Sequence, residues 1–172
     1  SASGCCLVGS EMCIRDSITG NDLNDFALSW AINSHNSNLP EYTENIEMNH
    51  DRYGSMAQRL PVNGIYFQRM DAKLAMADAS YQWIDIDPFG SPVPFIDSAI
   101  QSLARTGVLE VTATDTAALT GSSLSSQKRR YGAQGIVDDY AHDDAVRVLL
   151  GMIAKTAAMH DRIIKPVSYT HL

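Results

Sequence analysis

The sequence has little cysteine, little positive charge and no long apolar run. All three cysteines, Cys5, Cys6 and Cys13, lie in the first 13 residues, and no histidine stands near them at metal-ligand spacing. No run approaches the roughly 20 apolar residues that a membrane span needs. No charged leader with an apolar centre opens the chain. We therefore expect no metal site, no membrane contact, and a soluble cytoplasmic protein.

The shortage of basic residues bears on nucleic-acid binding. Acidic residues outnumber basic ones by 20 to 13, which gives a net charge of −7. This balance argues against a protein whose whole surface binds nucleic acid, but it leaves local basic contacts open. The 172 residues are 45% apolar and 19% charged, enough for one α/β domain with a buried core.

The two ends of the chain differ from the rest. The stretches "GCCLVGSEMCIRDS" and "PVSYTHL" resemble translated sequencing-adapter sequence and show neither helical nor strand periodicity. We assign residues 1–17 and 166–172 to non-native segments that give no basis for predicting the fold, and residues 18–165 to one partial domain.

Between these ends, strand and helix patterns alternate. Apolar residues at helical spacing predict a helix from Leu23 that includes Trp30. We expect a loop over about 34–62, with a short helix near 53–59. Further on, the patterns predict strands within 64–72, 81–87 and 108–115, and helices within 94–107 and 136–160. The aromatic residues Trp30 and Trp83 are assigned to the core.

This alternation predicts a parallel sheet with helices on both faces. In such sheets, ligands bind at the carboxyl ends of the strands. Four aspartates are expected at or just past four successive strand ends: Asp22, Asp71, Asp87 and Asp115. Their clustering predicts a functional site at that edge.

The stretch "WIDIDPFGSPVPF" indicates the chemistry of this site. A strand that ends in Asp87-Pro88 holds a carboxylate and a carbonyl at the sheet edge, because proline cannot donate to the ladder. Phe89 offers a flat stacking surface, and Gly90 lets the backbone pass close to a ligand. Methylation of an exocyclic base amine needs such groups, because the delocalised nitrogen must be held in line with the methyl donor.

Four motifs carry a resemblance. They are "IDIDPFGSPVPFIDSA", "VTATDTAALTG", "RRYGA" and "HDDAVRVLLGMIAKTAA", in this order. Together they resemble the tRNA (guanine-26-N2)-dimethyltransferases, a class I S-adenosylmethionine-dependent family, over about residues 21–164. The joint occurrence of "DPFGSP" and "TATDTAALTG" is the most specific part. The resemblance implies a Rossmann-like class I methyltransferase fold, in which residues 18–165 are part of the catalytic domain.

The resemblance also implies roles for individual residues. Asp22 would accept hydrogen bonds from the ribose of S-adenosylmethionine, while Asp71 and the Ala72 backbone would face its adenine. Asp87 would bind the target amine of a tRNA guanine. The remaining residues that the resemblance places at the substrate or at RNA phosphate are Pro88, Phe89, Gly90, Thr114, Asp115, Arg129, Arg130 and Tyr131. It implies tRNA as partner, with no obligate protein partner inferred.

The chain departs from the family in what it lacks. The family's first strand, its acidic-small-Gly cofactor loop, the segment before them and the C-terminal domain are absent. We therefore expect a fragment that retains the amine half of the site, is inactive alone, and exposes a central sheet edge.

Plainer interpretations stay open for several residues. Asp22 is also placed to cap a helix, and Asp71 and Asp87 suit turns. Phe89 suits a core position, and the run from Gln127 to Arg130 suits a solvated surface. Two alternative functions also remain: an adenine or cytosine amino-methyltransferase acting on DNA or RNA, and a non-catalytic nucleotide-binding domain.

Overall fold

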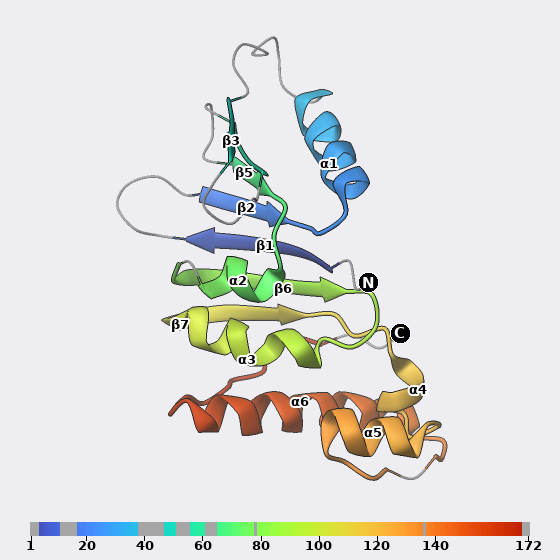
Figure 1. The fold of residues 1–172 in the computed structure, drawn as a ribbon. Helices are drawn as coiled ribbons and strands as arrows, with labels where there is room; N and C mark the ends of the chain where they lie inside the picture. Colours follow the sequence, from blue (N-terminus) through green and yellow to red (C-terminus); the bar gives the residue numbers. More distant parts are fainter. Residues whose placement is uncertain are drawn as a thin grey trace.

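The computed structural model describes residues 4–10, 17–37, 47–50, 56–60, 65–77, 79–135 and 137–169. Within these residues, the strands form a seven-stranded sheet in the order β3-β4-β5-β2-β1-β6-β7 (Figure 1). The strands are β1 (Gly4–Ser10), β2 (Ser17–Asn21), β3 (Glu47–His50), β4 (Met56–Leu60), β5 (Ile65–Gln68), β6 (Tyr81–Pro88) and β7 (Leu103–Val111).

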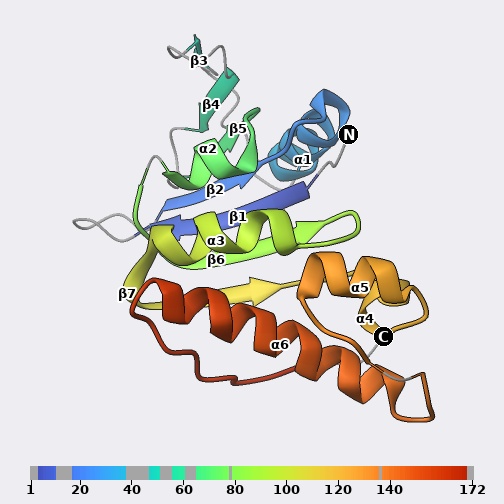
Figure 2. The ribbon, with the colours of Figure 1, turned by 60° about the horizontal axis from the view of Figure 1, so that its bottom comes forward.

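The helices lie beside the sheet and beyond its end. They are α1 (Asp25–Ser37), α2 (Ala72–Ala77), α3 (Val93–Ser102), α4 (Thr116–Leu119), α5 (Leu124–Tyr131) and α6 (Ala141–Met159). Helix α3 packs against α2 and α6 as well as against β6 and β7 (Figure 2). Helices α4 and α5 lie past the end of β7 (Figure 1). No helix in the described part of the chain is long and apolar enough to cross a membrane.

Strand direction defines one functional edge. Strand β2 runs parallel to β5, and β6 runs parallel to β7. Strand β1 is antiparallel to both β2 and β6, so β5, β2, β6 and β7 all point the same way. We call the edge where these four strands end the rim. Both crossovers, from β2 to β5 and from β6 to β7, pass through a helix, as parallel neighbours require.

Strand β1 occupies the gap that the missing first strand was expected to leave. Residues 4–10 pair with β2 over five positions and with β6 over six. Residues 4–10 are thus part of the sheet although they lie in the segment assigned as non-native, because backbone pairing needs no side-chain periodicity. The expected open central edge is likewise covered. A non-native origin of the terminal segments stays a prediction, and residues 1–3, 11–16 and 170–172 lie outside the described residues.

The core lies on one side of β6. Ile84 and Ile86 are fully buried and pack with Ile96 and Ala99 of α3. Trp83, on the opposite side of β6, is 51% exposed, so this part of the sheet has one covered face where two were predicted. Burying the two isoleucines contributes about 2 kcal/mol each, and this fixes the direction in which the alternate residues of β6 point.

Several predicted elements differ in detail. Trp30 is 68% exposed on α1, so both tryptophans assigned to the core are exposed. Residues 56–60 form β4 rather than a helix. Helix α3 ends at Ser102 and β7 begins at once, so Gly107 lies inside a strand. A Cβ on Gly107 would stand 3.0 Å from the Gln82 carbonyl oxygen, which explains a glycine there without a helix end.

Candidate active site at the sheet rim

Asp87 stands at the rim as a free acceptor. It is the last residue but one of β6, and its side chain is exposed. Within the described residues no group donates a hydrogen bond to its carboxylate. Pro88 is buried and ends the strand, while the side chain of Phe89 is 82% exposed. Both the carboxylate and the ring are therefore accessible to solvent at the end of β6, where a planar amine could reach them.

Gly90 makes the turn after Phe89. Its φ of 100° lies in the region that side chains disfavour, although a Cβ there would meet nothing within 4 Å. The glycine is thus needed for the backbone conformation. The Gly90 amide donates to Thr114 Oγ1 at 2.7 Å, and the Thr114 amide donates to the Gly90 carbonyl at 3.0 Å. Two reciprocal bonds join the loops that follow β6 and β7.

Asp115 joins a third element to these loops. Tyr131 at the end of α5 donates its hydroxyl to Asp115 Oδ1 at 2.6 Å, and Arg130 donates to Oδ2 at 2.9 Å. The Tyr131 hydroxyl also lies 3.1 Å from Ser91 Oγ. Burial first, and then the hydrogen bond to Asp115, raise the pKa of Tyr131 well above its ordinary value. The phenol therefore keeps its proton at neutral pH.

The basic residues after the Gly-Ser stretch lie on helix α5. Lys128, Arg129 and Arg130 form the last turn of α5, where their charge favours the helix carbonyl end. Arg130 is already paired with Asp115. Contacts of Arg129 and Arg130 with RNA stay a prediction.

Asp22 and Asp71 lie at the other part of the rim. Each accepts an amide two residues ahead through Oδ1, from Asn24 at 2.7 Å and from Lys73 at 2.9 Å. Both aspartates therefore stabilise a local turn, as the plainer interpretation predicted. The Oδ2 atom of each takes no part in these two hydrogen bonds. Asp22 is buried and Asp71 is exposed, while Ala72 begins α2. The Asp22 amide donates to the Gln68 carbonyl at 3.3 Å, which joins the segment that carries Asp22 to the end of β5, three residues before Asp71.

Sequence reasoning missed Asn21. This residue is 2% exposed, and its Nδ2 donates to the Met70 carbonyl at 3.0 Å, which ties the end of β2 to the segment after β5. Its Oδ1 is buried without a hydrogen-bond partner. An orphaned acceptor beside Asp22 fits a site for a polar ligand with hydroxyl or amino groups. The amide directly before the strand-end aspartate was the signal in the sequence.

One strand separates the two parts of the rim. Cys6 of β1 pairs with Asn21 on one side and with Ile86 on the other, and Cys5 pairs with Asp87. Two strand spacings put the backbones of β2 and β6 about 10 Å apart. This separation suits a cofactor on the β2 side and an acceptor amine on the β6 side.

Negative charge gathers on the open face of β6. Burial raises the pKa of Asp85, and the nearby charges of Glu110 and then Asp87 raise it further. Asp85 lies opposite Glu110 in the β6–β7 register. In the described part of the chain, no group of three potential metal ligands occurs, and we find no metal centre there. The negative field favours a cationic ligand over a phosphate.

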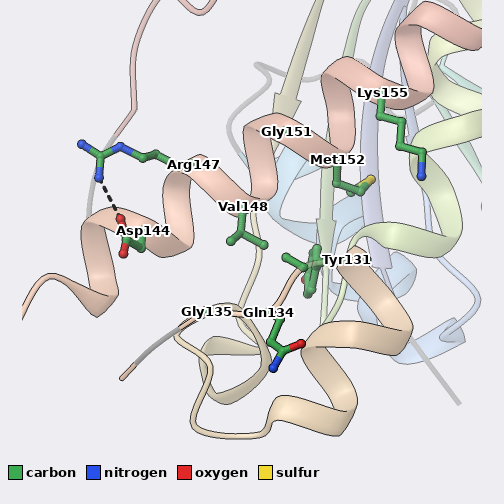
Figure 3. A pocket seen from close by; sticks show the side chains of 11 residues that line it. Tyr131, Gln134, Gly135, Asp144, Arg147, Val148, Gly151, Met152 and Lys155 are labelled. Atoms are coloured by element: carbon green, nitrogen blue, oxygen red, sulfur yellow. Dashed lines mark hydrogen bonds and ion pairs between the residues drawn. The ribbon is translucent and has the colours of Figure 1, made fainter. Parts of the chain in front are cut away.

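A groove of about 430 Å³ lies behind the rim, between α6 and the segment after α5 (Figure 3). Tyr131 and Gln134 line one side, and Val148, Met152 and Lys155 line the α6 side. Asp144 and Arg147 at its end form an ion pair at 2.7 Å. The groove contains neither Asp87 nor Phe89, so it is separate from the candidate amine site and shares only Tyr131 with the network around Asp115.

The family model for N2,N2-dimethylguanosine tRNA methyltransferase matches residues 8–171. The chain belongs to this family. The match includes the strand ends that carry Asp22, Asp71, Asp87 and Asp115, and it extends into both terminal segments that the sequence marks as foreign.

Relatives within the family cover the same region. The tRNA (guanine(26)-N(2))-dimethyltransferase of Metallosphaera sedula is 46% identical over 114 residues, 65% of this chain and 30% of that protein. That of Thermoplasma volcanium is 48% identical over 87 residues, 51% of this chain and 25% of that protein. The chain thus spans less than a third of the length of these relatives.

A solved structure supports the fold. Trm1 from Pyrococcus horikoshii, in complex with S-adenosyl-L-methionine, superimposes with a TM-score of 0.70 at 32% identity. The match covers 82% of this chain and 37% of that one. The predicted class I methyltransferase fold, present in part, is confirmed.

Proposed function

We propose that the chain is the acceptor-amine part of an S-adenosylmethionine-dependent enzyme that methylates the N2 amine of guanine 26 in tRNA. The observation that carries the proposal is the exposed Asp87 carboxylate, which accepts no hydrogen bond from the described residues and lies two positions before the exposed Phe89 ring. Family membership and the names of the relatives support tRNA as substrate and guanine as base. A tRNA-modifying enzyme works where its tRNA is, which favours the cytoplasm.

The chemistry follows from the acceptor nitrogen. Its lone pair is delocalised into the base, so the amine is a weak nucleophile. Asp87 would accept an N–H hydrogen bond, orient the lone pair toward the methyl carbon, and take the proton that the nitrogen loses. The N–C bond forms as the C–S bond of the donor breaks, and the sulfur leaves as a neutral thioether. Phe89 stacks on the base and fixes its plane. S-adenosylmethionine, when bound, supplies the methyl group on a sulfonium sulfur, whose positive charge suits the acidic rim.

The residues of the β2 side fit the cofactor's polar parts. In this proposal Asp22 accepts the ribose hydroxyls, and Asp71 and the Ala72 backbone face the adenine. The buried Asn21 Oδ1, which has no hydrogen-bond partner among the described residues, supports a polar ligand here. Among the described residues, β1 runs antiparallel to its neighbours, so it begins at the rim and does not end there. The chain also spans less than a third of the length of the relatives, and we expect it to be inactive alone.

The test is methyl transfer by a full-length protein that contains this sequence. Transcripts with guanine or adenine at tRNA position 26 and a DNA duplex are supplied with labelled S-adenosylmethionine. Asp87→Asn should lower the rate by about 10²-fold or more, because acid–base and positioning groups contribute that much. Asp97→Asn, an exposed aspartate of α3 that contacts His160, is the matched control and should leave the rate unchanged.

The outcomes separate the alternatives. Transfer to guanine 26 alone supports the proposal. Transfer to adenine or to duplex DNA supports a different amino-methyltransferase, and full activity of Asp87→Asn supports a nucleotide-binding domain whose carboxylate has no part in catalysis.

A further inference from the structure

The loop that follows Asp87 must be held still if the proposed function is right. Phe89 and Gly90 form this loop, and Phe89 itself is exposed and packs against little. A base that stacks on a mobile ring would lose its alignment, since misplacement by about 1 Å costs on the order of 10²-fold in rate. The loop therefore needs support from outside β6.

Side chains from two other elements supply that support. Thr114, after β7, exchanges two hydrogen bonds with Gly90, at 2.7 and 3.0 Å. Ser91, the residue after Gly90, lies 3.1 Å from the Tyr131 hydroxyl. We call the six residues of this arrangement the rim network: Gly90, Ser91, Thr114, Asp115, Arg130 and Tyr131.

Asp115 is the centre of the rim network. Its side chain is 8% exposed, and its two oxygens are used by different donors, the Tyr131 hydroxyl and the Arg130 guanidinium. The guanidinium offsets the charge of a carboxylate that would otherwise be costly to bury. Asp115 also precedes α4, but its side chain makes no capping bond there. Its hydrogen-bonding capacity is thus directed to α5 rather than to its own helix.

We propose that Asp115 and Tyr131 are positioning residues that fix the Phe89–Ser91 loop for the acceptor base, with Arg130 as the counter-charge of Asp115. The proposal rests on the proposed function of Asp87, because it assigns these residues to the same site. It also gives Arg130 a role within the protein, distinct from a phosphate contact. The Tyr131 ring lies in a small core with Ala118 and Leu119, so its hydroxyl is held in place from behind.

Amide hydrogen exchange of the 172-residue chain tests the network without turnover. Tyr131→Phe keeps the ring and removes only the hydroxyl, and Asp115→Ala removes both bonds. Each variant should speed exchange of the Gly90 amide about tenfold, which corresponds to the loss of one ordinary hydrogen bond. The amides of Ile84 and Ile86, in the buried part of β6, should exchange as in the wild type.

Tyr81→Phe is the matched control. Tyr81 is buried to a similar degree, 6% against 7% exposed, and it donates its hydroxyl to the Ala75 carbonyl at 2.8 Å, away from the rim. This variant should leave Gly90 exchange unchanged. Unchanged Gly90 exchange in Tyr131→Phe and Asp115→Ala would overturn the proposal. Equal acceleration at Gly90, Ile84 and Ile86 would also overturn it, because that result marks a general loss of stability.

A second measurement connects the network to the base. Guanosine is titrated into the chain, and the Gly90 amide resonance is followed. Tyr131→Phe should weaken binding about tenfold, and Asp87→Asn should abolish it. If guanosine shifts no rim resonance in the wild type, the proposed function loses its support, whereas the exchange result still decides whether the network holds the loop.

Discussion

The two parts of the rim are built differently. On the β6 side, side chains from three elements hold the loop after Asp87 through the rim network, and Asp115 uses both of its oxygens. On the β2 side, Asp22 and Asp71 each accept an amide from their own turn. There Asn21 keeps a buried oxygen without a partner.

This difference separates a site that is complete from one that needs a further component. A satisfied network is rigid before its ligand arrives, and so it can orient a weak nucleophile at little entropic cost. A buried carbonyl without a partner lowers the stability of the folded chain. A ligand that donates a hydrogen bond to it would remove this cost. The β6 side should therefore work within this chain, whereas the β2 side should not.

The largest expected effect concerns cofactor binding. Isothermal titration of the 172-residue chain with S-adenosylmethionine should show no micromolar affinity, because β1 begins at the rim and therefore brings no strand end there to hold the cofactor. Guanosine, in contrast, should bind. A micromolar dissociation constant for S-adenosylmethionine would contradict the expectation that only the β6 side of the rim binds its ligand in this chain.

Two buried amides allow a comparison in unfolding free energy. Gln127 of α5 is 1% exposed, and both polar groups of its side-chain amide are hydrogen-bonded. Its Nε2 donates to the Leu119 carbonyl at 3.0 Å, and its Oε1 accepts from the Gly135 amide at 2.6 Å. Gln127→Ala should lower the free energy of unfolding, measured in urea, by about 2–4 kcal/mol, because it leaves the Leu119 carbonyl and the Gly135 amide without a hydrogen-bond partner. Asn21→Ala should cost less than about 1 kcal/mol, because it also removes an unpaired carbonyl. Equal costs would show that Asn21 is as well satisfied as Gln127.

Two glycines with open space around them isolate the effect of backbone conformation. Gly90 has a φ of 100°, whereas Gly151 lies in α6, and a Cβ on either would meet nothing within 4 Å. Gly90→Ala should destabilise the chain by about 1–2 kcal/mol. Gly151→Ala should stabilise it by about 0.5–1 kcal/mol, as alanine does inside helices. Thermal unfolding of both variants measures these changes in stability. If Gly90→Ala stabilised the chain, the backbone conformation at Gly90 would not require glycine.

The smallest expected effect is on pH dependence. The folded chain raises the pKa of Tyr131 above the ordinary 10.0, chiefly through burial. The unfolded phenol therefore ionises first, and the stability that Tyr131 contributes is complete below about pH 10 and falls as the pH rises beyond it. Denaturant unfolding at roughly pH 9 and 11 should show a smaller loss in Tyr131→Phe than in the wild type. Equal losses of unfolding free energy in the two proteins would show that burial does not raise the pKa of Tyr131.

The sequence was sufficient to predict the end of β6 and the residues that occupy it, whereas β5 and β7 end about four residues earlier than predicted. Asp87 was placed correctly because proline ends β6 directly after it, and a proline's effect on the backbone is local. The helix from Leu23 was also predicted, but burial of Trp30 was not borne out. An apolar stripe shows which side of a helix prefers burial, and it does not supply the surface that covers that side.

The rim network could not be read from spacing. The Tyr131 hydroxyl contacts Ser91, 40 residues earlier in the chain, and Asp115, 16 residues earlier. These residues come together because α5 packs on α4. Strand β1 was missed for the opposite reason. Its pairing depends on backbone groups that every residue has, so residues 4–10 gave no pattern.

The direction of β1 has a practical consequence. Gly4 pairs with Pro88, so the chain enters the sheet where its parallel strands finish. Gly4 thus lies beside the end of β6, next to the strand position of Asp87. A purification tag at the beginning of the chain would be attached close to the proposed base site, and it should be cleaved before any binding experiment.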